Sequence, residues 1–169
     1  MKIKKNIFVF LIFIFIFSGC KINYSFTGGS IDPAIKSISI QYFPNNALLI
    51  QPKLSQLFTE ALRDKFATQT KLTLINKGGD LQIEGAIIGY STQPVAIQGN
   101  ETAAMNRLTI TVNVKFTNKL NEQQNFEQTF SRYIDYLSTA NLSSIEETLI
   151  SEINEMLVDD IFNKSVVNW

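Results

Sequence analysis

The chain has 169 residues, with 15 Lys and Arg, 15 Asp and Glu, one Cys and no His. The absence of His excludes Ser-His-Asp and Cys-His catalysis and His-containing metal sites, and a single Cys excludes an internal disulfide. Because three of the 15 basic residues precede Cys20, residues 20–169 carry 12 basic and 15 acidic groups, a net charge of about −3. This balance is not typical of nucleic-acid-binding proteins, which neutralise phosphates with Lys and Arg.

The N-terminal segment has the organisation of a secretory signal peptide. Lys2, Lys4 and Lys5 precede an uninterrupted apolar run over residues 7–17. A helix of that length rises only about 16 Å, about half the thickness of the bilayer's hydrocarbon core, so the run is too short to span a membrane comfortably. We therefore expect residues 1–19 to be removed as a lipoprotein signal peptide.

The only Cys follows this apolar run directly. The sequence Phe17-Ser18-Gly19-Cys20 resembles a bacterial lipobox, in which small residues precede a Cys that takes a diacylglycerol and becomes the mature N-terminus, although Phe17 stands where Leu is usual. We predict Cys20 to be a lipid anchor, since each buried CH₂ of an acyl chain contributes about 0.8 kcal/mol. The alternative is an ordinary signal peptide followed by an incidental Cys. By analogy with lipoprotein sorting, Lys21 favours the periplasmic side of the outer membrane over retention in the inner membrane.

The remainder divides into a short tether and one domain. Ser, Thr and Gly are frequent just after Cys20, so residues 20–34 are predicted to be the lipidated N-terminus and tether. Residues 35–169 have the composition and length of a single α/β domain.

The domain begins with a predicted strand followed by a helix. Residues 36–43 alternate, which places Ile38, Ile40 and Tyr42 on one face of a strand. A helix is expected from Pro52, because Pro suits the first helical turn and apolar residues then recur at helical spacing. The predicted apolar stripe comprises Leu54, Leu57, Phe58, Ala61, Leu62 and Phe66.

Two short strands and an irregular stretch are predicted next. Strands over about 71–76 and from Leu81 are separated by the turn-forming residues 77–80. Residues 93–106 contain Pro, Gly and Asn and are predicted to be irregular.

The fourth strand carries the clearest alternation. Its predicted apolar face consists of Leu108, Ile110, Val112, Val114 and Phe116. A fifth strand places Phe126, Phe130 and Ile134 inward and polar residues outward. One face of the sheet is therefore core, and the other is wet or meets a partner.

A final helix is predicted to open at Ser143, where Ser143 and Glu146 have the spacing of a capping box. Its apolar stripe comprises Ile145, Leu149, Ile153, Met156, Leu157 and Ile161. The element order β-α-β-β-β-β-α favours an α+β fold. We expect a two-layer sandwich, with two helices on one face of a four- or five-stranded mixed sheet.

Basic residues mark the polar face of the fourth strand. Arg107, Lys115 and Lys119 share this face, and Arg132 lies on the likely neighbouring strand with inward parity. These cations either solubilise a one-sided sheet or contact anionic headgroups or a partner protein. Adjacent carboxylates such as Glu146 and Glu147 point about 100° apart on a helix and are typical of a solvated face rather than an acid/base pair. The sequence predicts no catalytic residue, no metal site and no cofactor.

The mature sequence resembles the Bacteroidetes form of the lipopolysaccharide-assembly lipoprotein family LptE. The resemblance lies in YSFTG at 24–28, ISIQYFPNN at 38–46, FTEALRDKF at 58–66, GDL at 79–81 with EG at 84–85, and NRLTI at 106–110. The final helix matches only in pattern.

The resemblance implies a non-enzymatic outer-membrane lipoprotein that plugs the lumen of an LptD-like β-barrel and assists insertion of lipopolysaccharide into the outer leaflet. It also implies a two-helix, four-strand fold. Arg107, Lys115 and Lys119 are then candidate contacts for lipopolysaccharide, headgroups or the partner, chosen from sheet parity and not carried over from the family. The alternative is a generic periplasmic outer-membrane lipoprotein, such as a secretin pilot or a lipid carrier.

Overall fold

The computed structural model describes residues 31–49, 51–95 and 104–167. The predicted signal peptide, the Cys20 anchor and most of the tether lie outside the described residues.

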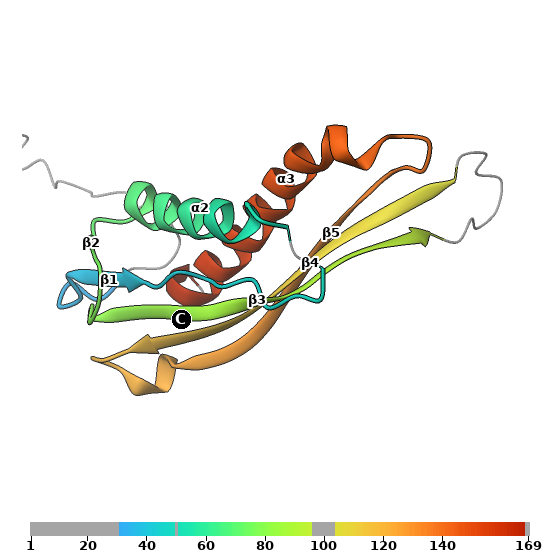
Figure 1. Ribbon diagram of the computed structural model, residues 1–169. Helices are drawn as coiled ribbons and strands as arrows, with labels where there is room; N and C mark the ends of the chain where they lie inside the picture. Colours follow the sequence, from blue (N-terminus) through green and yellow to red (C-terminus); the bar gives the residue numbers. More distant parts are fainter. Residues whose placement is uncertain (1–30, 50, 96–103, 168–169) are drawn as a thin grey trace, which may run out of the picture.

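The described residues form one mixed sheet with two helices on one side (Figure 1). The strand order is β2-β1-β3-β4-β5, in which β1 is parallel to both β2 and β3 and the last three strands are antiparallel. The strands are β1 Ser37–Ile40, β2 Thr73–Ile75, β3 Leu81–Val95, β4 Met105–Asn118 and β5 Phe126–Leu137. The helices are α2 Leu54–Gln69 and α3 Leu142–Phe162, with a short 3₁₀ helix at η1 Glu122–Gln124 and a π-helical segment at η2 Asn163–Val167. The predicted two-layer α+β fold with two helices on one face of a mixed sheet is confirmed, and of the predicted four or five strands the sheet has five.

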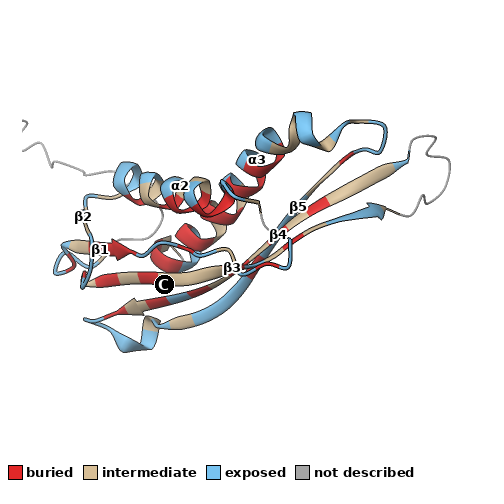
Figure 2. Cartoon of the chain, in the orientation of Figure 1, coloured by how far each residue is buried: buried red, intermediate tan, exposed pale blue. Residues whose placement is uncertain are grey.

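The core lies between the helices and one face of the sheet. The five predicted apolar residues of β4 are at most 1% exposed, and the polar residues between them lie on the other face. Figure 2 shows the buried sides of α2 and α3 turned toward the buried strand segments. Full burial of one such side chain contributes about 1.5–3 kcal/mol, so the alternation decides which face the helices cover. None of the helices in the described ranges has the length and apolar character that crossing a bilayer requires.

The first strand is shorter than predicted, and the predicted position of Tyr42 is wrong. β1 ends at Ile40, whose carbonyl accepts a hydrogen bond from Arg63 Nη2 of α2 at 2.9 Å. Beyond it the alternation fails: Phe43 is fully buried, and Tyr42 is 56% exposed instead of lying beside Ile38. The N–H of Phe43 donates to Thr59 Oγ1 at 3.1 Å, which turns this residue rather than Tyr42 toward α2.

Two further expectations are corrected. The predicted irregular stretch 93–106 is partly strand, because β3 and β4 stay paired as far as Val95 and Met105. The capping box is also absent: α3 begins at Leu142, and the side chain of Asn141 accepts the hydrogen bond from the N–H of Ser143 at 3.0 Å.

Glu146 has a different role, which depends on a bulge in β3. Ile88 is an extra residue in the β3–β4 register and is exposed. The bulge reverses the parity of β3, so Tyr90 turns to the helix side and its hydroxyl donates to Glu146 of α3. Burial, together with this bond, raises the pKa of Tyr90. The contact joins the C-terminal part of β3, beyond the bulge, to the first turns of α3.

Between β2 and β3 the chain crosses β1. Ser37 pairs with Thr73 of β2, and Ile38 pairs with Leu81 of β3, so these two strands flank β1 on opposite sides. The connecting chain passes β1 where β2 descends to the start of β3 (Figure 1). A Cβ at Gly79 would lie 2.6 Å from the backbone N of Ser39, so the crossing leaves no room for a side chain there.

Asp80 fixes the end of this crossing. Its Oδ2 accepts hydrogen bonds at 2.9 Å from the backbone N–H of Lys36 and from the backbone N–H and hydroxyl of Ser37. These bonds, led by that from Lys36, lower the pKa of Asp80. The carboxylate therefore ties the start of β3 to the start of β1.

We predict that Gly79→Ala destabilises the protein by about 3 kcal/mol, because the new methyl group meets backbone atoms that cannot move aside. Gly78→Ala is the matched control: Gly78 has φ of 80° with open space around it, so only backbone strain of about 1–2 kcal/mol is expected. Urea unfolding of the full chain measures both variants. Equal losses would contradict the close crossing of β1.

Candidate interaction face

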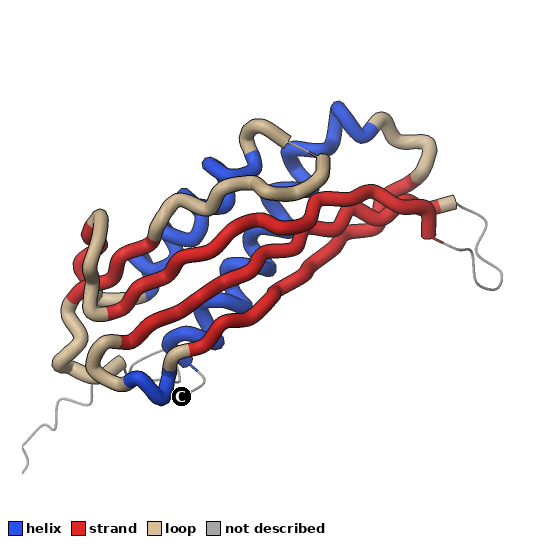
Figure 3. Tube along the Cα trace, turned by 60° about the horizontal axis from the view of Figure 1, so that its bottom comes forward, coloured by secondary structure: helices blue, strands red, loops and turns tan. Residues whose placement is uncertain are grey.

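Over the three long strands, the side of the sheet that faces away from the helices is mainly polar and is left uncovered by the described residues. Figure 3 views this side, with the long strands in front and the helices behind. We call it the open face. Its members on the three long strands are Gln82, Glu84, Ala86, Gly89, Ser91, Gln93, Val95, Met105, Arg107, Thr109, Thr111, Asn113, Lys115, Thr117, Glu127, Thr129, Ser131, Tyr133, Asp135 and Leu137.

Arg107 lies at one end of the open face in a closed cluster. Its guanidinium makes a bidentate pair with Asp135, at 2.7 Å from Nε and 2.8 Å from Nη2. The same group lies over the ring of Tyr133, 3.6 Å from the centroid. These hydrogen bonds lower the pKa of Asp135 and raise the pKa of Arg107. A phosphate could reach this cation only by displacing a well-aligned carboxylate.

Lys115 lies toward the other end of the open face between two carboxylates. Its Nζ is 2.9 Å from Glu84 Oε1 on β3, and its register partner on β5 is Glu127. The hydrogen bond to Glu84 raises the pKa of Lys115, and the charge of Glu127 adds to the effect. Eight residues of strand place Lys115 about 26 Å from Arg107 along β4.

Neutral side chains occupy the middle of the open face. The hydroxyls of Thr111 and Ser131 are 2.9 Å apart, and Thr109, Asn113 and Thr129 surround them. With two cations and three carboxylates, the open face has a net charge of −1. It is therefore a hydrogen-bonding surface with internally paired charges and not a positive patch.

The other basic residues singled out from the sequence lie elsewhere. Lys119 follows the end of β4, and its Nζ donates to the carbonyl of Gly78 at 2.8 Å. Arg132 has the predicted inward parity and pairs with Asp160 of α3 at 2.6 and 2.7 Å. The structure thus places Arg107 and Lys115 on one face, with Lys119 beyond its edge.

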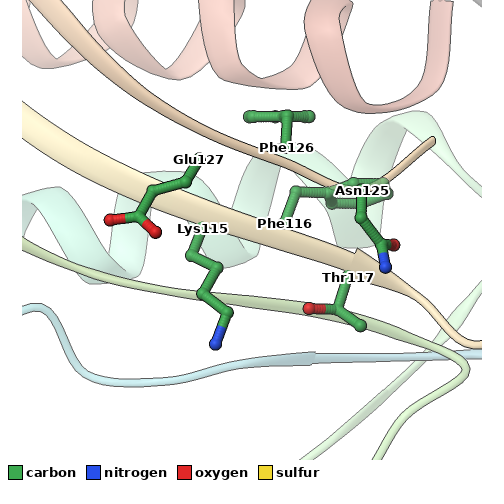
Figure 4. Close-up of a pocket in the computed structure, with 6 residues that line it drawn as sticks. All are labelled: Lys115, Phe116, Thr117, Asn125, Phe126 and Glu127. Carbon is green, nitrogen blue, oxygen red and sulfur yellow. The ribbon is translucent and has the colours of Figure 1, made fainter. Parts of the chain in front are cut away.

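Two hollows adjoin Lys115. The larger, which we call the Tyr42 hollow, has a volume of about 470 Å³. It is lined by Gln41, Tyr42, Glu84, Asn113, Lys115 and Glu127. A smaller one of about 270 Å³ shares Lys115 and Glu127. Beside it, Lys115 and Thr117 point to one side of β4 and the rings of Phe116 and Phe126 to the other (Figure 4).

Sequence reasoning missed the Tyr42 hollow. Glu84 could have been placed on the polar side from its position between Ile83 and Gly85 in the alternation. Tyr42 could not, because its predicted strand face was inward and the tertiary bond to Phe43 reverses it. Within the described residues, no group of three or more acidic, Cys or His side chains is placed to hold a metal ion.

The sequence of the described domain matches one known protein family. A family model described as "LptE: Lipopolysaccharide-assembly" matches residues 35–165. A comparison with curated proteins gives no match.

Several solved structures are similar to the chain. Rare lipoprotein B from Shewanella oneidensis is 15% identical, with 76% of this chain and 92% of that chain covered and a TM-score of 0.50. A putative neuraminyllactose-binding hemagglutinin homolog from Helicobacter pylori is 8% identical, with 84% and 89% covered and a TM-score of 0.51. A minor lipoprotein from Acinetobacter baumannii is 13% identical, with 73% and 91% covered and a TM-score of 0.48. At these identities the first two establish a shared fold.

The internal pairing of charge on the open face predicts a gain of function. Asp135→Asn should increase binding of the full chain to phosphatidylglycerol vesicles at low salt severalfold, because Arg107 loses its carboxylate partner. Unfolding free energy should fall by no more than about 1 kcal/mol, since the ion pair is partly exposed. Vesicle sedimentation measures the binding.

Asp160→Asn is the matched control, because it releases Arg132 on the helix side by the same change of charge. An equal gain in this variant would show that net charge, and not the open face, governs binding.

Proposed function

The chain belongs to the LptE lipopolysaccharide-assembly family, and we propose on this basis that it is a non-enzymatic subunit of a lipopolysaccharide translocon that plugs the lumen of an LptD-like β-barrel. The family match runs from before β1 into η2, so it covers all five strands and both helices. The observation that supports the plugging role is the open face, the polar side of the sheet that the helices leave uncovered while they cover the apolar side.

The charge pattern of the open face suits burial against a polar wall. The interior of an outer-membrane barrel is polar and offers hydrogen-bonding groups. A buried charge without a partner is costly, whereas a paired and hydrogen-bonded one is tolerated. Arg107 and Lys115 bring their carboxylate partners with them, so a barrel wall need supply only hydrogen bonds.

The three candidate contacts with lipopolysaccharide differ in the partner that each cation must leave before it can bind a phosphate. Arg107 and Lys115 would have to leave carboxylates to take a lipid A phosphate, whereas the Nζ of Lys119 leaves a neutral carbonyl oxygen. Of the three candidates, Lys119 therefore needs the least reorganisation. Removal of its charge would weaken phosphate binding without opening an ion pair.

We also propose that the chain is held on the periplasmic side of the outer membrane by an acylated Cys20, after removal of residues 1–19. The support is the basic, apolar and small-residue sequence before that Cys, together with membership of a lipoprotein family. Two or more acyl chains give a stable anchor, because one chain binds a membrane only weakly.

The plug predicts direct contact between the open face and the barrel. A photo-reactive residue at Ser131, in the middle of the open face, should form an adduct with the co-expressed LptD-like protein on irradiation of intact cells. The exposed Thr68 on α2 is the matched position on the helix layer. An adduct from Thr68 but none from Ser131 would overturn the orientation, and isolation of the chain free of any barrel in mild detergent would overturn the plug.

The anchor predicts that Cys20→Ala moves the chain from the membrane fraction to the soluble periplasmic fraction. The expected change is loss of most of the membrane-bound protein, since the acylation site is removed. Cys20→Ser serves as the near-isosteric comparison. Continued membrane association of the alanine variant, in cells that lack the barrel, would contradict lipidation.

A further inference from the structure

The Tyr42 hollow has the dimensions of a small-molecule site. Its volume of about 470 Å³ falls within the range of 300–1,000 Å³ that is typical of ligand pockets. It lies at the Lys115 end of the open face and reaches Asn113, so Thr111, Ser131 and the Arg107 end remain available to a barrel wall. What the hollow can bind follows from the ring, the hydrogen-bonding groups and the net charge of its lining.

The ring of Tyr42 is exposed on a fixed segment of chain. Tyr42 is 56% exposed, although its neighbour Phe43 is fully buried and packs edge-on against Phe58 with ring centroids 5.0 Å apart. On either side, the N–H of Gln41 donates to the carbonyl of Ile83, and the carbonyl of Pro44 accepts from the N–H of Ile87, both at 2.9 Å. The segment is thus bonded to β3, and the ring is presented without first having to be ordered.

The polar lining offers donors and acceptors together. Gln41 and Asn113 carry amides, which can both donate and accept, Lys115 donates, and Glu84 and Glu127 accept. A sugar hydroxyl is itself a donor and an acceptor, so a mixed set of this kind satisfies several hydroxyls at once. An apolar ligand would leave these groups unpaired, which is costly.

The charge of the lining selects against phosphate. One lysine between two glutamates gives the hollow a net charge of −1, and the ammonium of Lys115 is already 2.9 Å from Glu84. An anion would face two carboxylates for one engaged cation. A neutral ligand avoids this repulsion and can still receive charge-assisted hydrogen bonds.

The floor of the hollow is close-packed backbone. Gly85 lines it, and a Cβ at this position would lie 2.0 Å from the carbonyl oxygen of Asn113 and 2.8 Å from the ring of Phe43. Gly85 pairs with the buried Val114, so a side chain here would point to the helix side and not into the hollow. The missing side chain lets Phe43 and β4 pack closely behind the backbone that lines the hollow.

From this geometry we propose that the Tyr42 hollow binds an uncharged sugar residue, with one face of the sugar stacked on Tyr42 and its hydroxyls bonded by Asn113, Gln41 and the Glu84–Lys115–Glu127 group. The site belongs to this chain alone and does not rest on the proposed barrel partner. It differs from recognition of lipid A phosphates, which would need free cations. The sugar could come from the core oligosaccharide of lipopolysaccharide or from another neutral glycan.

The test is isothermal titration of the full chain in detergent, without the barrel, against two probes. One is a delipidated and dephosphorylated core oligosaccharide, and the other is a linear glucan heptamer. We expect saturable binding of at least one probe, no binding of inorganic phosphate, and no competition by phosphate. Binding of the core oligosaccharide alone identifies lipopolysaccharide as the source, and binding of both identifies a general hexose site.

Variants of the ring locate the site. Tyr42→Ala should weaken binding about tenfold, because one stacking contact of an aromatic ring is lost, and Tyr42→Phe should retain most of the affinity. Tyr133→Ala is the matched control, because Tyr133 is 50% exposed at the other end of the open face. Thermal unfolding checks that each variant is folded.

Three results would overturn the proposal: no binding of either oligosaccharide, equal affinity in Tyr42→Ala, or displacement of the sugar by phosphate. None of them bears on the barrel adduct from Ser131, so the sugar site and the plug can fail separately.

Discussion

Between β2 and β3 the chain crosses β1 on the side that carries Ser37 and Ser39, so closely that residue 79 can have no side chain. Asp80 then accepts three hydrogen bonds from Lys36 and Ser37. Together these contacts fix the register of β1 against β3. Register decides sidedness, because a slip of one residue would turn every side chain of a strand to the opposite face. Ile38 and Ile40 of β1 therefore turn to the helix side beside the apolar residues of β3 only if this crossing is made correctly.

The helix layer and the sheet are also joined by polar contacts at the margins of their interface. Arg132 of β5 pairs with Asp160 of α3, and the Tyr90 hydroxyl reaches Glu146 after the bulge at Ile88 has turned it to the helix side. The apolar residues fill the space between these contacts. The helices thus use one face of the sheet completely, and whatever the protein binds through the sheet must be bound by the other.

The open face differs from the cationic surface that its sequence indicates. Arg107 and Lys115 point the same way, as strand parity requires, but Asp135, Glu84 and Glu127 come from neighbouring strands to balance them. A face with paired charges and central hydroxyls is buried against a polar partner at a lower electrostatic cost than a face with unpaired charges. This property links the fold to a role in assembly, as expected of an LptE family member. It also leaves the Tyr42 hollow as a place where neutral groups bind in preference to anions.

Local pattern by itself determined the element order, the two amphipathic helices and the inward residues of β4, because burial of a single face imposes a period of two or 3.6 residues on the sequence. It also marked Arg107 and Lys115 as residues of one face, and the sequence blocks near β1 and α2 indicated the family. Only the tertiary structure decided the exposure of Tyr42, the ion pairs of the open face, the partner of Glu146 and the crossing at Gly79. Each of these depends on groups at least 16 residues apart, such as Phe43 with Thr59 or Arg107 with Asp135. Periodicity describes only how a segment faces its surroundings, whereas the identity of those surroundings is set by register and packing between segments.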